Sequence, residues 1–92
     1  MTLYVSNLAM ETTREELLKA FQTHGEVESV TLPADRMKSG VPVGARRGYG
    51  FVVMRARAEA RAALKGMDGI SFHGRAISVR VANPKWTPTY AN

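Results

Sequence analysis

The order of hydrophobic periods constrains the fold of this chain more than any other feature. Residues 3–8 (LYVSNL) alternate apolar and polar side chains, as a half-buried strand does. The apolar residues that follow recur at three- and four-residue intervals, which is the period of a helix. The same change of period occurs again later, so the sequence predicts the order strand, helix, strand, strand, helix, strand.

The first predicted helix has a clear start and a clear end. Thr13 followed three residues later by Glu16 is typical of a capping box, and Gly25 ends the segment. Its residues at helical spacing are Leu17, Leu18, Phe21 and His24. Residues 27–35 then predict a second strand that Pro33 ends, and residues 36–46 a long loop of turn-forming and basic residues.

The second half of the chain repeats the pattern with a weaker helix start. Residues 56–67 predict a helix, but no Ser, Thr, Asp or Asn stands in front of it as a cap. Its expected apolar stripe is Ala60, Ala63, Leu64 and Met67. Residues 68–74 carry turn signals around a short extended piece, and residues 75–82 predict the last strand. Its inward set is Ile77, Val79 and Val81, and its outward set is Ser78 and Arg80.

Residues 47–54 (RGYGFVVM) form the third predicted strand, whose two faces differ sharply. One face carries Arg47, Tyr49, Phe51 and Val53, and the other carries Gly48, Gly50, Val52 and Met54. Burying the ring face would also bury Arg47, which is costly for an unpaired charge. We therefore expect Val52 and Met54 in the core, with the glycines allowing helices to approach the sheet. Tyr49 and Phe51 then lie exposed beside Tyr4.

Composition limits the class of protein. The 92 residues, 45% hydrophobic, suit one small domain, and without cysteine no disulfide or thiolate metal site is possible. The start of the chain does not resemble a signal peptide, and no run of 18 apolar residues occurs. We expect an intracellular protein, cytoplasmic or, if eukaryotic, nuclear, that is monomeric and does not bind membranes. The net charge of +5 and the sequence pI near 10.1 favour an anionic partner.

Two of these segments resemble the signature sequences of the RNA recognition motif family. Residues 3–8 resemble its hexamer, and residues 47–54 match seven of the eight positions of its octamer. Met54 replaces the final aromatic residue of the octamer, at a position that strand parity directs into the core. The segment VANP and the short chain are similar to small single-domain bacterial members of the family.

This resemblance implies an α+β fold, the ferredoxin-like βαββαβ sandwich. A four-stranded antiparallel sheet would carry both helices on one face, with the first and third strands as central neighbours. The implied domain covers residues 1–83, followed by a short tail at 84–92. Trp86 and Tyr90 in that tail either fold back onto the open sheet, extend its stacking surface or belong to an ordinary disordered terminus.

The resemblance also implies single-stranded RNA as the ligand, with single-stranded DNA as the other nucleic acid to consider. Bases would stack on Tyr4 and Phe51, and Tyr49 would pack against the sugars between them. Arg47 would contact a phosphate. The remaining candidate contacts are Asn7, Ser78 and Arg80 near the sheet and Arg36, Lys38 and Arg46 in the long loop.

Alternative interpretations remain open at this point. Tyr4 is also compatible with an ordinary surface tyrosine, and the loop cations with solvated charges. A protein-interaction member of the family would bind a peptide instead of RNA, and an acylphosphatase-like enzyme would share the architecture. We expect no cofactor, no metal and no catalytic residue, since neither a nucleophile with a base nor a metal cluster is recognisable. His24 and His73 are expected to serve in helix-end packing and in a turn.

Overall fold

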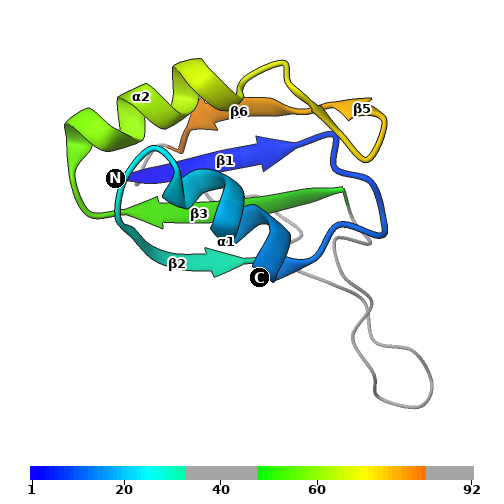
Figure 1. Cartoon of the computed structure of the whole chain (residues 1–92), viewed down its shortest axis with the longest axis horizontal. Helices are drawn as coiled ribbons and strands as arrows, with labels where there is room; N and C mark the ends of the chain where they lie inside the picture. The colour runs from blue at the N-terminus through cyan, green and yellow to red at the C-terminus, as the bar shows by residue number, and fades with distance from the viewer. Residues whose placement is uncertain (33–47, 83–92) are drawn as a thin grey trace, which may run out of the picture.

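The computed structural model describes residues 1–32 and 48–82, and its elements follow the predicted order (Figure 1). The elements are β1 (Thr2–Ser6), α1 (Arg14–Gln22), β2 (Val27–Thr31), β3 (Tyr49–Met54), α2 (Arg57–Met67), β4 (Ser71–Phe72), β5 (Arg75–Ala76) and β6 (Ser78–Val81). The last predicted strand is divided in the structure. Its first part, β5, pairs with β4 in a separate hairpin, and its second part, β6, joins the main sheet.

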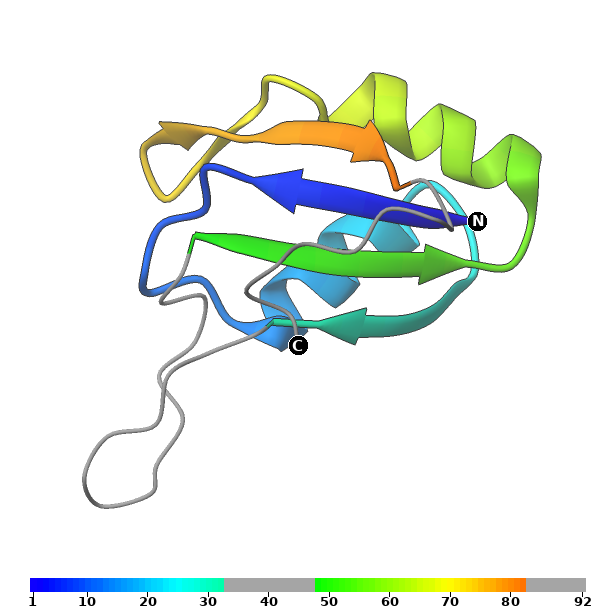
Figure 2. The same ribbon diagram turned by 180° about the vertical axis from the view of Figure 1, so that it is seen from behind.

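The main sheet has the strand order β2-β3-β1-β6, and each neighbouring pair is antiparallel. Both helices lie on one side of it, and the view from behind shows the other side, which neither helix covers (Figures 1 and 2). We call this second side the open face. The expected α+β sandwich of the ferredoxin-like type is therefore confirmed, with β1 and β3 at its centre.

The register of β1 and β3 decides which side chains reach the core. Leu3 pairs with Val52 and Val5 with Gly50, and the side chains of Leu3, Val5 and Val52 are fully buried. Met54 is fully buried as well, so the predicted orientation of β3 is confirmed. The helices contribute to the same core through Leu17, Phe21, Ala60, Ala63 and Met67.

Two packing expectations are wrong. Val81 is 50% exposed, because it is the last residue of β6, an edge strand with a neighbour on one side only. At Gly50, the space that a Cβ would take is occupied by the end of β2 and not by a helix. An added Cβ would lie 2.5 Å from Leu32 Cδ2 and 2.9 Å from the carbonyl oxygen of Thr31.

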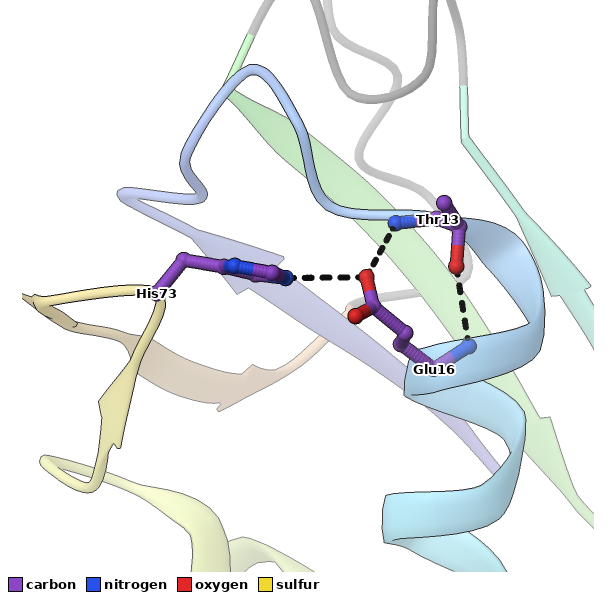
Figure 3. Close-up of polar contacts among 3 residues, drawn as sticks. All are labelled: Thr13, Glu16 and His73. Atoms are coloured by element: carbon purple, nitrogen blue, oxygen red, sulfur yellow. Dashed lines mark hydrogen bonds and ion pairs between the residues drawn. The ribbon is translucent and has the colours of Figure 1, made fainter.

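The two helices differ at their N-termini, as their sequences predict. In α1, the backbone N–H of Glu16 donates to Thr13 Oγ1 over 3.2 Å (Figure 3). In return, Glu16 Oε1 accepts from the backbone N–H of Thr13 over 2.9 Å, which completes the capping box. α2 starts after Ala56, whose extended backbone suits a cap but whose side chain makes no capping bond.

α2 is held beside the end of α1 by two close approaches at glycine. A Cβ on Gly66 would collide with the imidazole ring of His24, and a Cβ on Gly25 would collide with the side chain of Glu59. Glu59 Oε1 also accepts a hydrogen bond from the backbone N–H of Glu26 over 2.9 Å. The predicted helix-end role of His24 is thereby confirmed. Among the described residues, no helix is both long enough and apolar enough to span a bilayer.

Candidate nucleic-acid interface

Three aromatic rings lie together at the centre of the open face, supplied by the two central strands. Tyr4 of β1 pairs across the sheet with Phe51 of β3, and Tyr49 stands two residues before Phe51 on the same side. The ring centroids of Tyr4 and Phe51 are 5.5 Å apart, and Tyr49 lies 5.9 Å from each of them. The predicted clustering of the rings is therefore confirmed.

The exposure predicted for Tyr49 is wrong. Tyr49 is 4% exposed, whereas Tyr4 and Phe51 are half-buried. Tyr49 does not belong to the hydrophobic core under the helices, so the assignment of the strand faces still holds. Tyr49 contacts both of the other rings, which cover part of its surface. The accessible aromatic surface therefore belongs mainly to Tyr4 and Phe51.

Polar side chains continue the open face toward the edge strand. Arg80 of β6 pairs with Tyr4, so Phe51, Tyr4 and Arg80 form one row across three strands. Arg80 is exposed and makes no hydrogen bond or ion pair with another described residue. In the neighbouring row, Ser78 pairs with Ser6 of β1. The structure thus brings Tyr4, Phe51, Arg80 and Ser78 to the same face.

Asn7 lies at the rim of this face in a left-handed conformation, with φ of 61°. Its Nδ2 donates to the carbonyl oxygen of Ala76 over 2.8 Å, and its Oδ1 accepts from an Nη of Arg75 over 2.7 Å. Both polar atoms of the side chain therefore hold the β4-β5 hairpin against the end of β1. Sequence reasoning placed Asn7 at the end of the first strand but missed Arg75, because their contact joins residues far apart in the chain.

The remaining predicted contacts fall outside the described residues. They are Arg36, Lys38, Arg46 and Arg47, and the same holds for Trp86 and Tyr90. The electrostatic character of the described open face therefore rests mainly on Arg80, with Arg75 at its rim.

His73 lies in the turn of the β4-β5 hairpin, as predicted, with φ of 53°. Its Nε2 is 2.9 Å from Glu16 Oε1, the same oxygen that accepts from the backbone of Thr13 (Figure 3). The hydrogen bonds from His73 and Thr13 hold the pKa of Glu16 below its ordinary value. His73 therefore ties the hairpin to the capped end of α1. No group of three or more potential metal ligands occurs among residues 1–32 and 48–82.

Comparison with known proteins gives a match to one family model. The model describes the RNA recognition motif, and it matches residues 3–78. The match includes all three rings, both helices and the β4-β5 hairpin.

Curated relatives and solved structures agree with this match. "Putative RNA-binding protein RbpF" of Nostoc sp. is 41% identical over 85 residues, which cover 92% of this chain and 76% of the relative. "Putative RNA-binding protein RbpA" of Synechocystis sp. is 38% identical over 85 residues, which cover 92% of this chain and 79% of the relative. The penultimate RNA recognition motif of the hypothetical RNA-binding protein RBM19 has a TM-score of 0.83 and 31% identity, covering 96% of this chain and 88% of that one. A structure titled "Sxl-lethal protein/RNA complex" has a TM-score of 0.78 and 26% identity. The match covers 92% of this chain and 48% of that one.

Proposed function

This chain belongs to the RNA recognition motif family, and on that premise we propose that it is a non-catalytic module that binds single-stranded RNA. Its relatives carry names of RNA-binding proteins, and a similar structure is titled as a complex with RNA. Both support RNA as the general class of ligand. A monomeric state and a cytoplasmic location are further parts of the proposal.

The observation that carries the proposal is the pair of half-buried rings, Tyr4 and Phe51, on a sheet face without a covering helix. Every nucleobase has a π face, so such rings hold unpaired bases with little regard to sequence. A duplex keeps its bases stacked inside and does not present them in this way. The open face therefore favours a single strand.

The proposal gives each residue a role. Tyr4 and Phe51 each stack one base, and Tyr49 supports both rings from the side. Ser78 and Arg80 contact base edges or phosphates over the edge strand. Asn7 acts mainly by holding Arg75 and the hairpin at the rim. The phosphate contacts assigned to Lys38, Arg46 and Arg47 rest on sequence alone.

Replacing Phe51 tests the proposal directly. Phe51→Ala should weaken binding of a short single-stranded RNA by about 1 to 3 kcal/mol, or roughly 5- to 150-fold in dissociation constant. Fluorescence anisotropy measures the affinity, and circular dichroism checks that the variant is folded. The matched control is Phe72→Ala, since Phe72 is a half-buried ring in the hairpin and not on the open face.

Three outcomes would contradict the proposal. The first is equal binding by the wild type and a folded Phe51→Ala variant. The second is a preference for duplex RNA over the single strand of the same sequence. The third is binding of a peptide ligand at this face without any binding of RNA, which would assign the domain to the protein-interaction class.

A further inference from the structure

The outer side of α2 carries a row of positive charge that stacking on the sheet does not use. Arg57, Arg61 and Lys65 are spaced four residues apart, so they follow one another along the helix about 6 Å apart. All three are exposed, and none forms a hydrogen bond or ion pair with another described residue. We call these three residues the basic row.

The acidic residues closest to the basic row in sequence are committed elsewhere. Glu59 Oε1 accepts from the backbone N–H of Glu26 over 2.9 Å. Asp68 Oδ1 accepts from the backbone N–H of Val79 over 2.9 Å. Neither carboxylate is three or four residues from Arg57 or Arg61, and only Asp68 has that spacing to Lys65. The positive charge of the row is therefore largely not neutralised by these carboxylates.

Two features of this arrangement act against the stability of α2. Like charges four residues apart destabilise a helix, and the cation of Arg57 in the first turn opposes the helix dipole. Glu59 in the first turn and Lys65 in the last turn favour the dipole, as the charged residues of α1 do. Unlike α1, however, α2 lacks a side-chain cap. Residues that lower the stability of their own helix are expected where they serve binding.

The position of the basic row follows from the helical period. Glu59 and Gly66 lie on the flank of α2 that meets the Gly25 turn and His24 at the end of α1. With 3.6 residues per turn, the basic row falls on the opposite flank. Among the strands of the sheet, α1 packs mainly on β2 and α2 mainly on β6. α2 lies at the β6 edge of the sheet (Figure 1), so the flank that carries the row faces away from α1 at that edge.

We propose that the basic row of α2 is a second phosphate-binding surface, which contacts RNA that leaves the open face across the β6 edge. Arg80 connects the two surfaces, since it lies on β6 in the same row as Tyr4 and Phe51. Phosphates fit the row because they are a regular series of negative charges and require no particular base. The inference rests on the proposed function, because it extends the path of the same RNA.

RNA length separates the two surfaces experimentally. A uridine tetranucleotide is long enough to fill the open face, where members of this family stack two or three bases. A uridine oligonucleotide of about 20 nucleotides reaches further than a stacking platform alone requires. Affinities of the wild type and of the triple variant R57Q/R61Q/K65Q are measured for both RNAs over a series of KCl concentrations. NMR titration serves for the tetranucleotide and fluorescence anisotropy for the longer RNA.

If the basic row binds phosphates, the triple variant should lose affinity for the long RNA only. Each phosphate contact on a single strand contributes about 0.7 to the slope of log affinity against log salt, so the triple variant should lose up to about 2 from that slope. The slope and affinity for the tetranucleotide should be unchanged. Glutamine favours helices, and removing the like-charge pairs should leave the melting temperature equal or higher. A melting temperature at or above that of the wild type would show that the lower affinity does not come from unfolding.

A matched pair of single variants controls for net charge. Arg61→Gln and Lys19→Gln each remove one exposed positive charge, from α2 and from α1 respectively. Only Arg61→Gln should reduce the salt slope for the long RNA, by about 0.7. Arg61→Lys should retain the wild-type slope, since a phosphate contact of this kind needs the charge and not the guanidinium shape.

Several results would overturn the inference. An unchanged slope of the triple variant on the long RNA, or equal losses on both RNAs, would contradict a second surface while leaving the open face intact. Failure of the wild type to bind either RNA would instead contradict the proposed function, and the inference with it. Row-dependent binding to phosphatidylserine vesicles with an unchanged RNA slope would assign the row to an anionic membrane surface.

Discussion

Tyr49 and Phe51 stand two residues apart in β3 and point to the same side of the sheet, yet their surroundings differ. Tyr49 is 4% exposed and touches both other rings, whereas Phe51 is half-buried. In the proposed mode of binding, a base would stack on Phe51 and Tyr4 and not on Tyr49. Tyr49 therefore contributes more to the shape of the surface than to its area.

The difference in burial predicts a difference in stability. Tyr49→Ala should lower the free energy of unfolding by about 3 kcal/mol, as for other buried aromatic residues, and Phe51→Ala by clearly less. Urea denaturation monitored by circular dichroism compares the two variants with the wild type. Equal losses of stability, or a larger loss for Phe51→Ala, would contradict the burial of Tyr49 beneath its neighbours.

A second prediction at this scale concerns Glu16. Hydrogen bonds from His73 and Thr13 lower its pKa in the folded state, so the folded protein favours the ionised carboxylate. The resulting stability is fully present above the unfolded value of about 4.3 and is lost as the pH falls through the lower folded pKa. The stability difference between the wild type and Glu16→Gln should therefore shrink as the pH falls through the acid range below that value.

Urea denaturation at a series of pH values measures this difference. Glu15→Gln is the matched control, because Glu15 is a glutamate in the same first turn that makes no hydrogen bond with another described residue. A difference for Glu16→Gln that stays constant with pH, or that grows in acid, would contradict the contact with His73.

At the scale of elements, the two helices differ at their N-termini, since α1 is capped by side chains and α2 is not. α1 has the reciprocal bonds of Thr13 and Glu16, and His73 adds a contact from the hairpin. α2 begins after Ala56, whose side chain makes no capping hydrogen bond. Its position depends on packing against the core and on the contacts of Gly66 and Glu59.

Changes at the two caps should therefore have opposite signs. Thr13→Ala should lower the free energy of unfolding by about 1 kcal/mol, and Ala56→Ser should raise it by a similar amount. Ala56 already has extended backbone angles, φ −94° and ψ 129°, which an N-cap requires. Thermal denaturation with a short RNA titration should show changed stability and unchanged affinity. Destabilisation by Ala56→Ser would contradict the uncapped start of α2.

At the scale of the whole molecule, alternating patterns within single strands predicted the architecture well. The alternation in residues 3–8 placed Leu3 and Val5 in the core. In residues 47–54 alternation separated the two faces, and the cost of burying Arg47 then placed Val52 and Met54 in the core and the rings on the other side. The capping box of α1 was equally clear, because both of its partners lie within four residues. Local patterns therefore decide strand faces and helix ends.

Features that depend on distant segments were less predictable. Tyr49 of β3 is buried and contacts Tyr4 of β1, and the space at Gly50 is occupied by Leu32, which follows β2. The contact of Asn7 with Arg75 joins residues 68 positions apart. No spacing rule within one element reports such contacts. Only the tertiary structure brings these residues together.

The central claim is that unpaired bases bind on the open face through Tyr4 and Phe51. Titration of the protein with a uridine tetranucleotide, followed by NMR, tests this claim most directly. The account predicts large shifts of the ring resonances of Tyr4 and Phe51 and of the backbone of Arg80, with little change at Lys19 on the outer side of α1. Unmoved ring resonances, or shifts that concentrate on α1, would contradict it.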